Sequence, residues 1–83
     1  MKSAAASGDP HEFAVTSLVH VLGAEVAAAV MSSVLAEVGI RRITNPHELL
    51  AFGRALQTRG GFEGATGAML AVEALLRGAS PLP

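Results

Sequence analysis

Three histidines are the residues of this chain best suited to binding a metal or moving a proton. His11 and His47 each follow a proline at a predicted helix start, and we expect both to be exposed. A helical zinc motif needs a second histidine four residues after the first, but Val15 and Ala51 occupy those positions. No glutamate opens the Glu-x-x-His pair of di-iron bundles, and there is no cysteine to supply a thiolate ligand or nucleophile. The sequence therefore predicts no metal site and no cofactor.

The remaining reactive side chains do not form a catalytic set, so we expect no enzymatic activity. His20 could act as a ligand, a base or a pH sensor, and we interpret it as a histidine at the boundary of the core. Ser32 and Ser33 have no histidine near them in the sequence, and Asp9, the only aspartate, is assigned to a helix cap. Most other charges lie where the helix dipole favours them, acids near helix starts and arginines near helix ends, and only three lack such a role: Glu37, Arg54 and Lys2.

The most glycine-rich segment, residues 60–67, does not fit a phosphate-binding loop. Such a loop follows a strand and usually carries a lysine, and neither is present around this segment. On the predicted last helix, Gly64, Gly67, Ala68 and Ala71 share one side instead. Small residues let two helix backbones approach closely, so this side is predicted to pack against a helix of the same chain or of a second chain, or to line a small-ligand groove.

Composition argues against two classes of partner. The 83 residues carry a formal net charge of −1 at pH 7, with one lysine and five scattered arginines, whereas nucleic-acid-binding domains carry clustered basic residues. The uncharged runs over residues 13–24 and 26–36 are too short for the roughly 18–20 residues of a membrane-spanning helix. The start of the chain also lacks the apolar segment of a signal peptide. We therefore expect a cytoplasmic protein, and its Ala- and Arg-rich composition is typical of GC-rich bacterial genomes.

Helix start and stop signals divide the chain into four predicted helices, over residues 10–22, 24–38, 46–59 and 62–77. Two Asx-Pro-His-Glu segments, 36 residues apart, each supply an N-cap, a first-turn proline and a first-turn glutamate. They represent either an internal duplication or two uses of one helix start. A glycine follows each predicted helix as a C-terminal cap, and the first of these glycines breaks what would otherwise be one long helix: Gly23, Gly39, Gly60 and Gly78.

These elements predict an all-α domain of two consecutive helical hairpins, forming a small four-helix bundle that could also be half of a dimeric bundle. The hairpins span residues 9–39 and 45–78 of a single domain, 9–78, and residues 1–8 and 79–83 are predicted to be flexible tails. Phe13, Leu50 and Leu70 fall outside the predicted inward stripes. The stripes are Val15, Leu18, Val19 and Leu22; Ala27, Val30, Met31, Val34 and Val38; Leu49, Phe52, Gly53 and Leu56; and Phe62, Ala65, Met69, Val72 and Leu76.

Hydrophobic residues make up 51% of the chain and charged residues 16%, which is more apolar surface than one small core can hide. The predicted function is therefore protein–protein interaction, as a self-associating scaffold, adaptor or regulatory subunit. The predicted partner is a second copy, in a homodimer or other homo-oligomer, or an unidentified protein. The alternative is a transcription-associated or small-ligand-binding regulator that uses Arg41, Arg42 and Arg54. The predicted interaction surface comprises Val26, Val30, Val34, Gly64, Gly67, Ala68, Leu70 and Ala71.

Overall fold

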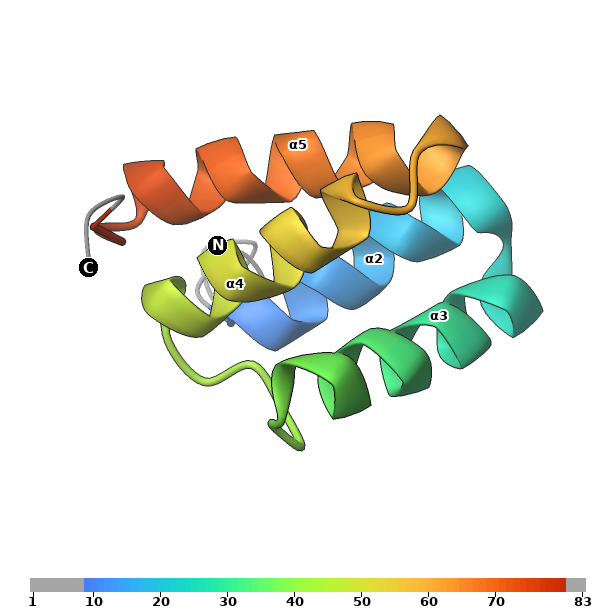
Figure 1. The fold of residues 1–83 in the computed structure, drawn as a ribbon, viewed down its shortest axis with the longest axis horizontal. Helices are drawn as coiled ribbons and strands as arrows, with labels where there is room; N and C mark the ends of the chain where they lie inside the picture. The colour runs from blue at the N-terminus through green and yellow to red at the C-terminus, as the bar shows by residue number, and fades with distance from the viewer. Residues whose placement is uncertain (1–8, 81–83) are drawn as a thin grey trace, which may run out of the picture.

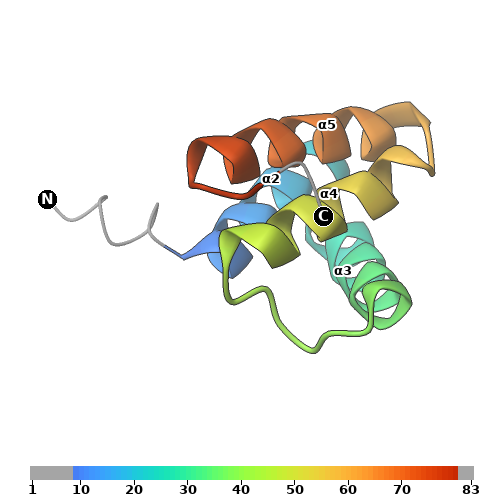
Figure 2. The same ribbon diagram turned by 60° about the vertical axis from the view of Figure 1, so that its left-hand side comes forward.

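The computed structural model describes residues 9–80, which form four helices and no strand. Helix α2 spans Pro10–Leu22, α3 Ala24–Val38, α4 Pro46–Gln57 and α5 Gly61–Leu76. Consecutive helices run in opposite directions, and α3 lies on the side of the bundle away from α5 (Figure 1, Figure 2). The predicted all-α four-helix bundle is confirmed, with the first two helices at their predicted bounds and the last two within two residues of theirs. The predictions for residues 1–8 and 81–83 lie outside the described residues.

Gly23 separates α2 from α3, as the sequence predicts. Its N–H donates to the carbonyl of Val19 at 2.9 Å, and its own carbonyl accepts the N–H of Ala27 at 2.9 Å. The same residue therefore ends one helix and begins the next. Its φ of 86° lies in the left-handed region that glycine adopts without steric cost, so the chain can turn within a single residue.

The two Asx-Pro-His-Glu segments have matching roles. Asp9 caps α2 by accepting the N–H of His11 at 3.0 Å, and Asn45 caps α4 by accepting the N–H of Glu48 at 2.9 Å. Each histidine then accepts a backbone N–H from the segment that follows its hairpin. The N–H of Ile43 donates to His11 Nδ1 at 3.1 Å, and that of Ser80 donates to His47 Nδ1 at 3.5 Å. His11 is therefore half-buried rather than exposed as predicted, because it holds the loop between α3 and α4.

The core confirms two of the four predicted stripes. The α3 stripe is buried except for its last residue, Val38, which is half-buried, and the α4 stripe is fully inside, joined by Leu50. The α2 stripe is rotated, because Ala14 and Ser17 face the core with Leu18 while Val19 is exposed. The predicted inward stripe of α5 is wrong, because the buried residues of this helix are Thr66, Gly67, Leu70 and Ala74.

The folded body continues one residue past the predicted boundary at residue 78. Ala79 is buried with the core, and its N–H donates to the carbonyl of Ala74 at 2.9 Å. The chain therefore turns back over the end of α5 before residue 80, and Ala79 belongs to the helical domain rather than to the predicted tail.

Helices α4 and α5 touch through two glycines. A Cβ built on Gly67 would lie 2.5 Å from the carbonyl oxygen of Gly53 and 2.8 Å from the backbone nitrogen of Gln57. A Cβ built on Gly53 would lie 2.8 Å from the carbonyl oxygen of Gly67 and 2.9 Å from the nitrogen of Ala71. No side chain fits between these backbones, so this closest contact of the hairpin requires glycine on both helices. The predicted packing of the small-residue side of α5 against a helix of the same chain is thus observed.

Replacing Gly67 by alanine is expected to destabilise the protein by about 1–3 kcal/mol, because the two backbones must separate to admit a methyl group. The effect should exceed the gain of up to ~1 kcal/mol in helix propensity. Gly64→Ala is the matched control, since the atom nearest to its Cβ would be the Gln57 carbonyl oxygen, at 3.3 Å rather than below 3 Å. Chemical denaturation followed by circular dichroism measures both variants. A Gly67→Ala protein as stable as the wild type would contradict the close backbone contact.

Glu48 gives the bundle a defined sensitivity to acid. Its carboxylate accepts the backbone N–H and the hydroxyl of Thr44, each at 2.8 Å, and these bonds hold the pKa of Glu48 below its usual value of 4.5. A carboxyl whose pKa is lowered by folding contributes its full stabilisation at pH values above its ordinary pKa of 4.5. This stabilisation is lost as the pH falls through the lower pKa of the folded state.

Glu48→Gln is therefore expected to lose less stability than the wild type between about pH 5 and pH 3. The variant keeps an acceptor oxygen for Thr44 but has no proton to take up. Glu12→Gln removes a carboxylate from an exposed first-turn position of α2 and is the matched control for loss of a charge. Urea unfolding midpoints measured across this pH range test the prediction. If the midpoint changes identically with pH in the wild type and Glu48→Gln, the Glu48 carboxylate is not the source of the acid sensitivity.

Candidate interaction surface

The interaction surface predicted from the sequence is not a continuous surface in the folded chain. Val34 and Leu70 are fully buried and Val30 is nearly so, because they are core residues of α3 and α5. The small residues of α5 pack inward: Gly67 is buried at the α4 contact, and Gly64, Ala68 and Ala71 are half-buried. Of the predicted set, only Val26 is largely exposed, and it lies on α3, which does not contact α5. The prediction is therefore corrected, since most of its residues are used within the chain.

The exposed apolar side chains gather instead on the outward side of α5. Phe62 is 76% exposed, Met69 45%, Val72 57% and Leu76 78%, and Ala65 lies exposed among them. We call these five residues the α5 seam. They are the stripe that the sequence predicts to face the core, and the structure turns it to solvent. The periodicity of the sequence correctly groups these residues on one side of α5, but the prediction that this side faces the core is wrong.

The glycine contact explains this reversal. Because Gly53 and Gly67 bring the two backbones together, the side of α5 that faces α4 can hold only small side chains near that contact. The larger side chains of the opposite stripe have no space there. A pattern of glycines on α4 and α5 at facing positions is the sequence signal that could have indicated the direction.

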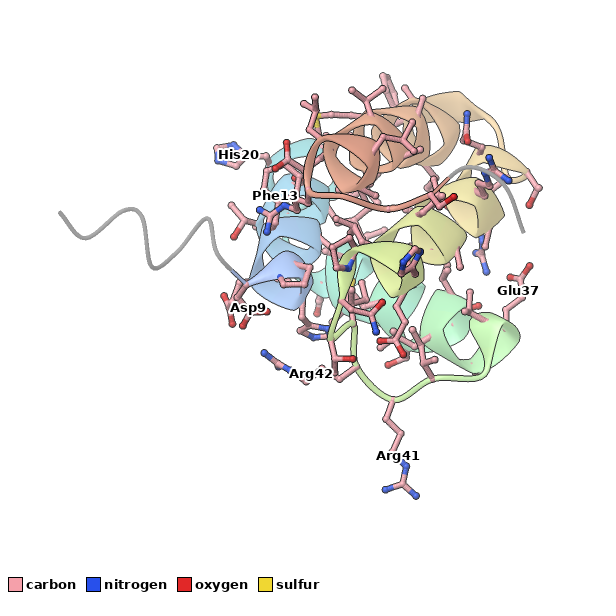
Figure 3. All side chains as sticks on the ribbon, turned by 90° about the vertical axis from the view of Figure 1, so that its left-hand side faces the viewer. Asp9, Phe13, His20, Glu37, Arg41 and Arg42 are labelled. Carbon is pink, nitrogen blue, oxygen red and sulfur yellow. The ribbon has the colours of Figure 1, made fainter. Side chains whose placement is uncertain are left out.

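A groove between α2 and α5 adjoins the seam. It has a volume of about 400 Å³ and is lined by Phe13, Thr16, Ser17, His20, Val21 and Met69. Met69 belongs to both the groove and the seam, so the two adjoin each other. His20 lines this groove, and its side chain points away from α2 (Figure 3). It is exposed, so it lies outside the core rather than at its boundary as predicted. Sequence reasoning missed Phe13 and Val21 because neither lies on a predicted stripe.

The charges around this surface are paired within the chain. Arg77 Nε donates to Glu73 Oε2 at 2.8 Å, and its guanidinium carbon lies 5.2 Å from the centroid of the Phe13 ring. At the other end of α5, Arg59 Nη1 lies 3.6 Å from Glu63 Oε1. The apolar surface is therefore bordered by ion pairs rather than by unpaired charges.

Arg59 also gives Glu37 the structural role that its sequence position did not reveal. The Arg59 guanidinium donates to Ser33 Oγ at 2.8 Å and to Glu37 Oε1 at 3.3 Å. Together with its contact to Glu63, these bonds connect α3 to the turn between α4 and α5. The guanidinium of Arg59 is therefore engaged by side chains of α3 and α5 within the chain.

The residues of the alternative regulatory function are dispersed. Arg42 forms an ion pair with Asp9 at 2.6 Å, while Arg41 points away from its loop into solvent (Figure 3). Arg54 is exposed on α4. A second groove, of about 480 Å³ between α2 and α3, has Arg41 and His11 in its lining, and its other lining residues are mainly apolar. The structure therefore does not bring the three arginines of the alternative together as one patch.

Substitutions on opposite sides of α5 are expected to differ sharply in their effect on stability. Leu76→Gln should change the free energy of unfolding by no more than about 0.5 kcal/mol, because Leu76 is solvent-exposed. Leu70→Ala should cost about 2–5 kcal/mol, because it removes a fully buried side chain. Thermal and urea denaturation at low protein concentration measures both. A large loss from Leu76→Gln would place the seam in the core, as the sequence alone predicted.

Residues 9–80 contain neither a metal-binding cluster nor a helix suited to crossing a membrane. No three His, Cys, Asp or Glu side chains come together there to hold a metal ion. None of the described helices combines the length and the apolar character that a membrane span needs. Comparison with known proteins supplies no family, because no family model, curated protein or solved structure matches the chain.

Proposed function

We propose that this protein is a protein-binding module, and that its binding surface is the α5 seam together with the α2–α5 groove. The observation that carries the proposal is the row of large apolar side chains exposed along one helix, from Phe62 to Leu76. Scattered exposed apolar residues are ordinary on soluble proteins, but a contiguous apolar patch is typical of an interaction site.

The strength of binding follows from the size of this surface. Burying a large apolar side chain completely is worth about 1.5–3 kcal/mol, and the four large seam residues are between about half and three-quarters exposed. Covering them would therefore supply roughly 4–8 kcal/mol, against an association cost of about 4–15 kcal/mol. The seam alone supports weak binding at most. A partner that also fills the α2–α5 groove would bind more tightly than one that covers the seam alone.

The paired charges favour protein binding over the alternative. Nucleic-acid binding depends on several phosphate contacts from unpaired basic side chains. Of the three arginines of the alternative, Arg42 is ion-paired with Asp9, and exposed Arg41 and Arg54 lie on separate elements. The large side chains of the seam, in contrast, are exposed to solvent. This difference supports recognition by burial of apolar area rather than by charge.

Site-specific photo-crosslinking tests the proposal in the cells that naturally make the protein. A photoreactive amino acid is placed at Val72 on the seam and, as the matched control, at the similarly exposed Val26 on α3. We expect a discrete protein adduct from position 72 and none from position 26, because only position 72 lies on the proposed surface. The same adducts from both positions, or none from either, would contradict the proposal.

A further inference from the structure

Building on the proposed function, we infer that the α5 seam is covered by α5 of a second copy of this chain, packed antiparallel about a two-fold axis. The seam residues follow one another at alternating spacings of three and four positions along α5. This is the spacing of a coiled-coil seam, which packs against another helix of the same spacing. A second copy supplies such a helix by definition.

The order of large and small residues along the seam is complementary to itself in one orientation. With the two-fold axis between Met69 and Val72, each Met69 faces Val72 of the second copy, and each Ala65 faces Leu76. Both of these layers combine a larger with a smaller side chain. Phe62 lies beyond them, because the position related to it by the two-fold axis, residue 79, is past the end of α5 at Leu76. In a parallel pair, Ala65 would face Ala65, and the two methyl groups would leave a void in that layer.

Charge also favours a second copy in the antiparallel orientation. The seam itself carries no charged residue, and its flanking charges are neutralised within each copy, Arg59 with Glu63 and Glu73 with Arg77. A second copy therefore brings no unpaired like charge to the surface. The antiparallel orientation places the positive, N-terminal end of each α5 dipole beside the negative, C-terminal end of the other. A strongly charged partner would find no unpaired opposite charge here.

The available area sets the strength of this dimer. Within the overlap of the two helices, Met69, Val72, Leu76 and the bordering Leu75, which is 41% exposed, offer roughly 130–270 Å² of side-chain surface per copy at about 60–120 Å² for each full side chain. A standard interface buries ~800 Å² per partner. Even with the α2–α5 groove added, the contact is at the small end, so the dimer is expected to be reversible, with a Kd of tens of micromolar or more.

Sedimentation equilibrium tests self-association over protein concentrations from about 10 μM to about 1 mM. Interference optics are needed because the chain has no Trp or Tyr. The wild type should change from monomer to dimer over this range. Met69→Lys, at the centre of the seam, should raise the Kd at least tenfold, while Val26→Lys on α3 should leave it unchanged. Circular dichroism confirms that both variants remain folded.

Cysteine crosslinking tests the orientation, which is straightforward because the chain has no cysteine of its own. A mixture of Ala65→Cys and Leu76→Cys proteins should form the mixed disulfide on mild oxidation, since the antiparallel contact places these positions within disulfide reach. Ala65→Cys alone should not crosslink with itself. Efficient self-crosslinking of Ala65→Cys would overturn the antiparallel arrangement.

Failure of this inference can be distinguished from failure of the proposed function. A wild type that stays monomeric to about 1 mM, or a dimer unaffected by Met69→Lys, would overturn self-association through the seam. If the photo-crosslinked adduct at position 72 then contains a different protein, the binding function stands with another partner. If no adduct forms either, both proposals fail. An adduct of two copies of this chain would support both.

Discussion

The contact between Gly53 and Gly67 is the constraint on which the arrangement of this protein depends. Two helix backbones meet there with no space for a single Cβ, so α4 and α5 form a tight hairpin. Such close approach replaces side-chain interdigitation with backbone contact, and interiors packed at this density resist even one added methyl group. The orientation of α5 about its own axis is thereby determined, and with it the identity of the residues that face solvent.

The position of the apolar surface is a consequence of that hairpin. Leu70 and Ala74 are buried on the inward side of α5, while Phe62, Met69 and Leu76 lie on the outward side and are exposed to solvent. Exposing such side chains costs folding free energy that a monomer would otherwise gain. The proposed binding function would account for their presence, because a partner that covers them would bury the same apolar area. The ion pairs at both ends of α5 leave this surface free of unpaired charge.

Side-chain hydrogen bonds connect other segments of the bundle to one another and to this hairpin. His11 accepts the N–H of the fully buried Ile43, and Arg59 connects α3 to the turn between α4 and α5. These bonds join segments more than twenty residues apart, and a buried N–H without an acceptor costs about 1–3 kcal/mol. The matching roles of His11 and His47 also give the repeated Asx-Pro-His-Glu segment a common structural purpose. The repeat is consistent with either origin, a duplication or two uses of one helix start.

The sequence alone determined the local structure of this protein. Caps at Asp9 and Asn45 and the break at Gly23 depend on residue type and immediate neighbours, so the helices could be predicted almost to the residue. The inward sides of α3 and α4 were also predictable, because their large apolar residues concentrate on one side. Only the tertiary structure decided which side of α5 faces inward and which long-range partners His11 and Glu37 have. Both sides of α5 are apolar, so its periodicity allows two orientations, and the steric contact with Gly53 selects the one that leaves the larger side chains outside.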